Sequence, residues 1–271
     1  MMPPASPQTE TSANPLLSIK GPVAELLLNA PARKNALPLA AWQRLPDFLE
    51  TVRNTPSVRV CVVRGAGGES FCAGADISEF EAIRATPEAA RRYDAINVAA
   101  FQALKSLPVP VIAAISGPCL GGGLGIALAC DIRIAAQSSV FSIPAARLGL
   151  AYPPEALADL LEAVSVSDAK HLLFTAERIP ADRALAIGLI NEVVADSALD
   201  SRIASLCEKM AGNAPLSLKA AKQALNHLAQ PAQATDLDAA HRDARVCIDS
   251  ADYREGCRAF LEKRPPQFRG L

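Results

Sequence analysis

The sequence predicts an α/β protein in which a largely parallel sheet is followed by a helical C-terminal region. Two observations carry this prediction. Short, nearly continuous apolar runs alternate with helical patterns over residues 16–150, which is typical of parallel strands covered on both faces. From about residue 154 onward the chain has almost only helical patterns, and no flexible linker precedes them.

Four apolar runs are expected to be strands, because each is short, partly β-branched and closed by turn residues. They are residues 23–29, 58–65, 109–117 and 131–139. Residues 37–54, between the first two, have helical spacing, although Pro46 is expected to kink or split that helix. Further helices are expected within residues 77–85 and 87–107, and along residues 156–229.

The composition limits the class of protein. Residues 1–14 are rich in Pro, Ser and Thr without the features of a signal peptide, so we expect a disordered tail, a core over 15–205 and a helical C-terminal region over 206–271. The net charge of −1 gives no reason to expect binding to nucleic acid or a membrane. Seven scattered cysteines without a CxxC pair indicate reduced thiols in a cytoplasmic protein. The three histidines lie far apart in the sequence, so no metal site is expected.

The segment GPCLGGGLGIALACD, residues 117–131, places three consecutive glycines between a strand and a helix. Such a turn exposes backbone N–H groups, which suit an anion or a developing oxyanion. It is not a Walker loop, because no Gly-Lys-Ser/Thr follows, and no acidic ribose partner supports a dinucleotide motif. Close helix–strand packing, in which glycine only provides room, is the alternative.

A second turn, GAGGESFCAGADISEF at residues 65–80, is also rich in Gly and Ala. The two turns can each direct one N–H at the same carbonyl oxygen. That is the minimum arrangement for stabilising an enolate without an ionisable side chain, and each such donor is commonly worth about 3 kcal/mol. The pair of turns therefore predicts an oxyanion hole.

The chain resembles the crotonase (enoyl-CoA hydratase/isomerase) superfamily in six segments, which occur in the family's order. They are NAPARKNAL (29–37), FCAGADISEF (71–80), SGPCLGGGLGIALACDIRIA (116–135), FSIPAARLGL (141–150), LLFTAERIPADRALAIGLINEVV (172–194) and FLEKRPPQFRG (260–270). The resemblance implies a crotonase-like spiral core of ββα repeats and a helical region that forms a homotrimer or a dimer of trimers. It also implies an enoyl-CoA hydratase or isomerase that acts through a thioester enolate, with coenzyme A as part of the substrate and no prosthetic group.

The resemblance also implies site residues by position. Ala75 and Gly122 would supply the two oxyanion-hole N–H groups. One set of substrate contacts, largely through backbone, would line the substrate path: Ala36, Ala73, Asp76, Ile77, Gly121, Ala145 and Gly149. A second set would meet the phosphate and nucleotide end of coenzyme A: Arg33, Lys34, Phe260 and Lys263. A solvated basic surface is the alternative for the charged members.

The chain departs from the family where hydratases carry two catalytic glutamates. These positions are Gly125, in GGGLG, and Ala145, in FSIPAA. Acid/base groups typically contribute 10²–10⁴-fold each, so their absence matters. Tyr152 and Glu155 are the candidate replacements, with a rigid loop bearing exposed side chains as the alternative. Arg147 is expected to pair with an acidic acyl group or with a carboxylate of the fold.

Other reactions stay open at this point. Decarboxylation, or hydrolysis of a C–C bond or a thioester, draws more on an oxyanion hole and substrate positioning than on paired carboxylates. A non-catalytic acyl-CoA-binding homologue is the other alternative. Cys72 and Cys119 flank the two turns and are expected to be buried hydrophobes, Asp131 to support a helix end, and Glu79 and Glu81 to face solvent.

Overall fold

The computed structural model describes residues 15–229, 245 and 248–267. Its main sheet has six strands in the order β1-β2-β3-β4-β6-β9. These strands are Leu16–Lys20 (β1), Val23–Leu28 (β2), Val60–Gly65 (β3), Val111–Ile115 (β4), Ile132–Ala136 (β6) and Glu192–Val194 (β9). β1 runs antiparallel to β2, and every other neighbouring pair is parallel. The predicted α/β class and the four predicted strands are confirmed.

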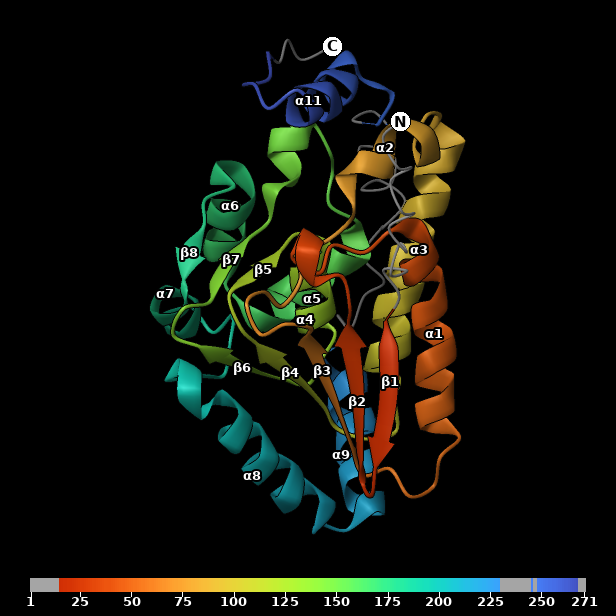
Figure 1. Ribbon diagram of the computed structural model, residues 1–271, viewed down its shortest axis with the longest axis vertical. Helices are drawn as coiled ribbons and strands as arrows, with labels where there is room; N and C mark the ends of the chain where they lie inside the picture. Colours follow the sequence, from red (N-terminus) through yellow and green to blue (C-terminus); the bar gives the residue numbers. More distant parts are fainter. Residues whose placement is uncertain (1–14, 230–244, 246–247, 268–271) are drawn as a thin grey trace, which may run out of the picture.

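Helices cover both faces of the main sheet (Figure 1). Helices α1 (Leu39–Arg53) and α3 (Pro87–Lys105) lie on one face and α8 (Leu199–Ala211) on the other. Successive residues of β3 serve the two sides in turn: Cys61 joins the α1/α3 core, whereas Val62 packs with Ile203 of α8. Burial on both faces explains why these strands read as continuous apolar runs.

A small second sheet carries the glycine-rich segment. It contains β5 (Pro118–Leu120), β7 (Val140–Ser142) and β8 (Ile179–Pro180), with β7 in the middle. Helix α4 (Gly122–Leu128) starts directly after β5. In Figure 1 this sheet lies beyond the carboxyl ends of β2 and β3, so α4 begins where the main-sheet strands end.

The C-terminal helix α11 (Ala251–Leu261) packs against the helical turn η3 (Pro144–Leu148). Glycines make this contact possible. A Cβ on Gly256 would come within 2.4 Å of the carbonyl carbon of Leu148, and a Cβ on Gly149 within 2.7 Å of the carbonyl oxygen of Asp252. Two backbones thus touch directly at this junction. The remaining helices and helical turns are Pro31–Arg33 (η1), Ile77–Glu79 (η2), Phe80–Ile83 (α2), Pro154–Ala163 (α5), Val166–Thr175 (α6), Ala181–Ala186 (α7), Asp196–Ala198 (η4) and Pro215–Leu228 (α9).

The structure differs from the sequence expectations in two places. Helix α1 continues through Pro46 as one element, so Pro46 does not split the helix, and the alternative of a kink stays a prediction. Strands β8 and β9 interrupt the region that was expected to be helical from residue 154 onward, because each short segment completes a sheet edge. The predicted boundary at residue 205 lies within α8, and that division remains a prediction; residues 1–14 lie outside the described residues. Among the helices of the described ranges, none has the length and apolar character needed to cross a membrane.

Candidate active site

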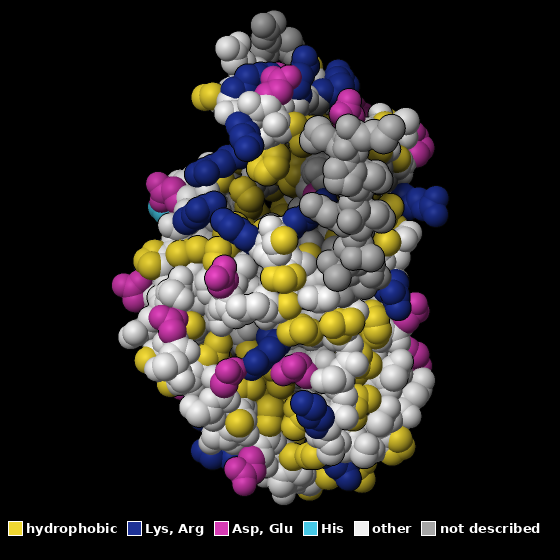
Figure 2. Space-filling model, in the orientation of Figure 1, with side chains coloured by type: hydrophobic (Ala, Val, Ile, Leu, Met, Phe, Trp, Pro, Cys, Tyr) yellow, Lys and Arg dark blue, Asp and Glu magenta, His cyan; other side chains and the backbone are white. Residues whose placement is uncertain are grey.

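A cavity of about 510 Å³ lies between α11, the small sheet and helix α3. Figure 2 shows it as a hollow with apolar side chains inside and basic side chains near its rim. Among the described residues, five basic ones line the cavity: the buried Arg84, and Lys34, Arg147, Arg178 and Arg264. Nine of the predicted site residues line this cavity: Lys34, Ala73, Ala75, Ile77, Gly121, Gly122, Ala145, Tyr152 and Phe260.

The two glycine-rich turns meet at one wall of the cavity. A Cβ on Gly74, whose φ is 93°, would lie 3.0 Å from the amide nitrogen of Gly122, so the first turn lies directly against the start of α4. Within the described ranges, the N–H groups of Ala75 and Gly122 donate no hydrogen bond to the protein. Both residues line the cavity. Two backbone donors are therefore available to a ligand at this wall.

The loop before α1 holds Ala75 in place. Leu37 donates its N–H to the carbonyl of Gly74 (2.8 Å), and its own carbonyl accepts from the N–H of Asp76 (3.0 Å), which forms a strand-like bridge. Asn35, fully buried with a φ of 55°, fixes this loop. Its amide donates to the carbonyls of Ala66 (2.9 Å) and Ser70 (2.7 Å). The role of Asn35 was not predicted from the sequence, although asparagine's tolerance of left-handed backbone is a usable signal.

Aromatic side chains occupy the space beside Gly125, the first glutamate position of the family. A Cβ on Gly125 would lie 2.6 Å from Cζ of Phe101 and 3.0 Å from the hydroxyl oxygen of Tyr152. Phe101 is buried and packs edge-on against Trp42, with ring centroids 5.8 Å apart. At the second position Ala145 lines the cavity and contributes only a methyl group. Neither position supplies an acid or a base.

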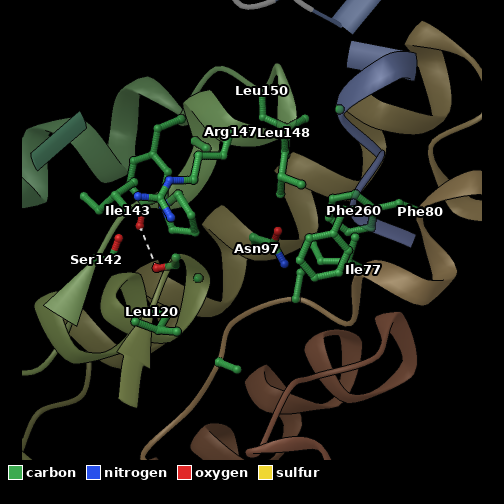
Figure 3. Close-up of a pocket in the computed structure, with 18 of the residues that line it drawn as sticks. Ile77, Phe80, Asn97, Leu120, Ser142, Ile143, Arg147, Leu148, Leu150 and Phe260 are labelled. Atoms are coloured by element: carbon green, nitrogen blue, oxygen red, sulfur yellow. Dashed lines mark hydrogen bonds between the residues drawn. The ribbon is translucent and has the colours of Figure 1, made fainter. Parts of the chain in front are cut away.

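The structure brings Tyr152 to the cavity but not Glu155. The hydroxyl of Tyr152 donates to the carbonyl of Gly121 over 3.1 Å, the dashed line in Figure 3. Burial raises the pKa of Tyr152, so its phenol stays protonated at neutral pH and is a hydrogen-bond donor rather than a base. Glu155 lies in the first turn of α5 and faces a separate surface pocket together with Arg91.

Five other predicted contacts lie outside the cavity lining. Arg33 forms an ion pair with Asp76, whose carboxylate also accepts hydrogen bonds from Ser78. Burial disfavours the charged form of Asp76, but the hydrogen bonds from Ser78 and Arg33 outweigh it and hold its pKa below the ordinary value. The other three serve the fold or face solvent: Ala36 is buried, Gly149 packs on α11 and Lys263 is exposed just after α11.

The predicted structural roles of Cys72, Cys119 and Asp131 are confirmed. Cys72 and Cys119 are buried, and burial raises the pKa of Cys72 to about 12, so its thiol is not a nucleophile at neutral pH. Asp131 accepts hydrogen bonds from the N–H of Val111 (2.7 Å) and from Nζ of Lys222 (2.8 Å), which ties the end of the α4 segment to β4 and α9.

Glu79 and Arg147 differ in whether the fold uses their charge. Glu79 does not simply face solvent as expected, because its carboxylate accepts a hydrogen bond from the N–H of Leu39 (2.7 Å) and thereby caps α1. Arg147 is exposed, lines the cavity and makes no ion pair within the described ranges. Its charge is therefore available to a ligand.

The contribution of α3 to the cavity was not predicted from the sequence. Tyr93, Asn97 and Phe101 recur at four-residue spacing, so they share one helix face, and that face lines the cavity. Just before α3, Arg84 is buried and pairs with Asp94 (2.6 Å). Helical spacing alone could have placed the three α3 side chains together, but not the cavity that they face.

The fold and this site define an enzyme of the enoyl-CoA hydratase/isomerase type, and the chain belongs to that family. The family described as "Enoyl-CoA hydratase/isomerase" matches residues 18–270. A short-chain-enoyl-CoA hydratase of Clostridium acetobutylicum is 36% identical over 93% of this chain and 95% of its own length. A crotonyl-CoA hydratase of Syntrophomonas wolfei is 34% identical over 94% of this chain and 97% of its own length.

Solved structures of the same family are similar to this one. The crystal structure of an enoyl-CoA hydratase/carnithine racemase from Magnetospirillum magneticum gives a TM-score of 0.79 at 36% identity, covering 96% of this chain and 97% of that one. A methylmalonyl-CoA decarboxylase complexed with 2S-carboxypropyl-CoA gives a TM-score of 0.86 at 30% identity, covering 96% of this chain and all of that one. The crotonase-like fold is thereby confirmed.

Proposed function

We propose that this protein binds an acyl-CoA thioester and stabilises its enolate with the N–H groups of Ala75 and Gly122. The observation that carries the proposal is that both N–H groups line one cavity and have no acceptor within the described ranges. Donors placed where negative charge develops are commonly worth about 3 kcal/mol each. Coenzyme A enters as part of the substrate, and the chemistry needs no prosthetic group.

Decarboxylation of a 2-carboxyacyl-CoA is the reaction that these residues support best. The bond between C2 and the carboxylate breaks, its electron pair forms the enolate, and CO₂ leaves. The negative charge lies on the thioester oxygen between the two N–H groups, and a proton from water then adds to C2. No base takes part, which fits glycine at position 125 and alanine at position 145. The likeness to methylmalonyl-CoA decarboxylase agrees with this reaction.

Tyr152 is the side chain proposed to assist. Its hydroxyl lies beside the carbonyl of Gly121, one residue before the Gly122 donor, and it stays protonated because burial raises its pKa. A protonated phenol at this place can orient the carboxylate that departs or donate a hydrogen bond to the product. Glu155 faces a different pocket and has no role in this proposal.

Hydration or isomerisation of an enoyl-CoA is the second candidate, because the family and its relatives carry those names. Hydration needs a group that activates water, and neither glutamate position supplies one. Under this candidate Tyr152 would be the proton donor and water activation would be weak. A non-catalytic acyl-CoA-binding role would follow if neither reaction occurs.

The rim of the cavity suits the phosphates of coenzyme A. Lys34, Arg147 and Arg178 are exposed there, and Phe260 of α11 is 54% exposed, which suits contact with an adenine ring. Assembly as a homotrimer or a dimer of trimers and a cytoplasmic location both stay predictions.

A two-substrate assay tests the proposal. The protein is incubated with methylmalonyl-CoA, and separately with crotonyl-CoA in heavy-oxygen water, and products are followed by mass spectrometry. We expect loss of CO₂ from the first and little labelled 3-hydroxyacyl-CoA from the second. Labelled product with crotonyl-CoA alone would instead establish a hydratase, and no product from either would favour a binding protein.

Two variants at position 122 test the oxyanion hole itself. Gly122→Pro deletes the N–H, whereas Gly122→Ala keeps it; both add a Cβ at 3.0 Å from the ring of Trp42, so they share that steric cost. We expect turnover to be lost in the proline variant and largely retained in the alanine variant. Equal rates in the two folded variants would exclude Gly122 as a donor.

A further inference from the structure

The α3 side of the cavity carries two hydrogen-bonding groups that the fold leaves unused. The hydroxyl of Tyr93 and the amide nitrogen of Asn97 are both buried, and neither has a hydrogen-bond partner of normal geometry among the described residues. They lie close enough to interact with each other. Buried polar groups nearly always have partners, so two adjacent exceptions inside a ligand cavity indicate an atom that the ligand supplies.

Their position along the helix places them beyond the reacting carbons. Phe101 lies against Gly125, in the helix α4 that begins with the Gly122 donor. Asn97 is one turn back along the same face of α3, or roughly 6 Å away, and Tyr93 is one turn further. In Figure 3 the Asn97 side chain projects between the Ile143 side of the pocket and the Phe80 and Phe260 side. An acyl chain that leaves the oxyanion site along α3 therefore passes Asn97 with its distal part.

We propose that Asn97 and Tyr93 select acyl groups that carry an uncharged oxygen atom, a carbonyl or a hydroxyl, in their distal part. This inference rests on the proposed function, because it names the acyl class of the thioester bound in the same cavity. The Asn97 amide donates to that oxygen. The Tyr93 hydroxyl stays protonated, because burial raises its pKa, and is a second donor.

The neighbouring charges explain why the oxygen is uncharged. Arg84, whose side chain is 3% exposed, acts electrostatically on Tyr93, but both its terminal nitrogens already donate to the carboxylate of Asp94 (2.6 and 3.3 Å). Its Nε donates to the hydroxyl of Tyr253 on α11 (2.9 Å). The Arg84–Asp94 pair is neutral as a unit, so an anionic acyl end would bring an uncompensated charge into a buried site.

Three saturated thioesters of matched length test this selection by isothermal titration calorimetry. They are hexanoyl-CoA, 5-oxohexanoyl-CoA, and glutaryl-CoA, which places a carboxylate where the second has its acetyl end. One added hydrogen bond is worth roughly five- to tenfold in affinity. We expect 5-oxohexanoyl-CoA to bind about tenfold more tightly than hexanoyl-CoA, and glutaryl-CoA to bind more weakly than both.

Variants on α3 test which side chains cause the preference for 5-oxohexanoyl-CoA. Asn97→Leu replaces the amide by a side chain of similar shape and should reduce the preference for the oxo compound, measured as the ratio of the two Kd values, to within twofold. Tyr93→Phe, which removes only the hydroxyl, should reduce the preference in part. Gln102→Leu, an exposed position on the same helix, is the matched control and should keep the full preference.

The outcomes separate this inference from the function on which it rests. Equal binding of hexanoyl-CoA and 5-oxohexanoyl-CoA to the parent protein would overturn the inference alone. Tightest binding of glutaryl-CoA would overturn the statement that the oxygen is uncharged. Failure of all three thioesters to bind would overturn the proposed function as well.

Discussion

Gly125→Ala gives the most direct test of why the family's first glutamate cannot stand in this chain. The added methyl would lie 2.6 Å from Cζ of Phe101, well inside van der Waals contact. Phe101 has little freedom to move away, because it is 3% exposed and packs edge-on against the fully buried Trp42. The substitution therefore overpacks a rigid aromatic contact.

The expected magnitude combines two opposing effects. Overpacking a close-packed core typically costs 1–3 kcal/mol. Replacing glycine by alanine inside a helix returns about 1 kcal/mol of helix propensity. The net loss in unfolding free energy is then about 0–2 kcal/mol, which for a chain of this length lowers Tm by at most roughly 4 °C.

Thermal melts of four proteins isolate the contact: the parent, Gly125→Ala, Phe101→Leu and the double variant. Because leucine lacks the Cζ that the new methyl would meet, the clash with the ring disappears in the double variant, and only the 3.0 Å approach to the Tyr152 hydroxyl remains. We expect a favourable coupling energy of about 1–3 kcal/mol between the two sites. Gly212→Ala is the matched control, since a Cβ there would have only an ordinary 3.5 Å contact with the carbonyl of Glu208, and it should not lower Tm.

Additive effects in this cycle would refute the reasoning. They would mean that the ring of Phe101 moves aside without cost, so Phe101 and Trp42 do not exclude a side chain at position 125. If the coupling is found, Gly125→Glu is expected to be less stable than Gly125→Ala, because it adds a buried carboxylate to the same clash.

Three further outcomes are expected. Tyr152→Phe loses the hydrogen bond to Gly121 and about 1 kcal/mol of stability, yet lowers kcat/KM for decarboxylation of methylmalonyl-CoA at least tenfold; unchanged kinetics would remove Tyr152 from the mechanism. Hydrogen bonds from Arg264 lower the pKa of Glu255 from 4.5 to about 2. The ionised carboxylate of Glu255 therefore stabilises the folded state fully above pH 4.5, and this stabilisation is lost as the pH falls toward 2. A titration midpoint of the Glu255 carboxyl near 4.5, measured by NMR, would contradict this expectation. Burial raises the pKa of Cys72 to about 12, so iodoacetamide at pH 8 should label this thiol only after the protein is unfolded in guanidinium. Detection of the label on the native protein by mass spectrometry would show that the site around Cys72 opens.

The main-sheet strands were predictable because their burial leaves a direct trace in the sequence. β3 and β4 are buried on both faces and are therefore almost wholly apolar. β1 has a mainly exposed pattern, and β9 has three half-buried residues; both are strands because a neighbouring strand offers its edge. Such strands form because of tertiary pairing, which leaves no hydrophobic periodicity in the sequence.

The candidate site, too, was predictable from the sequence only in part. The turns that carry Ala75 and Gly122 were predictable, because glycine and alanine at a strand-to-helix turn have a backbone reason to be there. The spacing between Tyr152 and Glu155 did not show which of them faces the cavity, since they are three residues apart and the first precedes α5. The Asn97 and Tyr93 pair depended on which face of α3 meets the cavity, and packing alone decides that.

The docking of α11 on η3 also has a consequence for synthesis of the chain. Gly256, Phe260 and Arg264 line the cavity, and they leave the ribosome after the sheet and the two glycine-rich turns. The sheet and the two glycine-rich turns are complete much earlier in translation, so a nascent chain carries the backbone donors in an unroofed cleft. Tight ligand binding is therefore expected only once α11 has left the ribosome and packs onto the Leu148–Gly149 backbone.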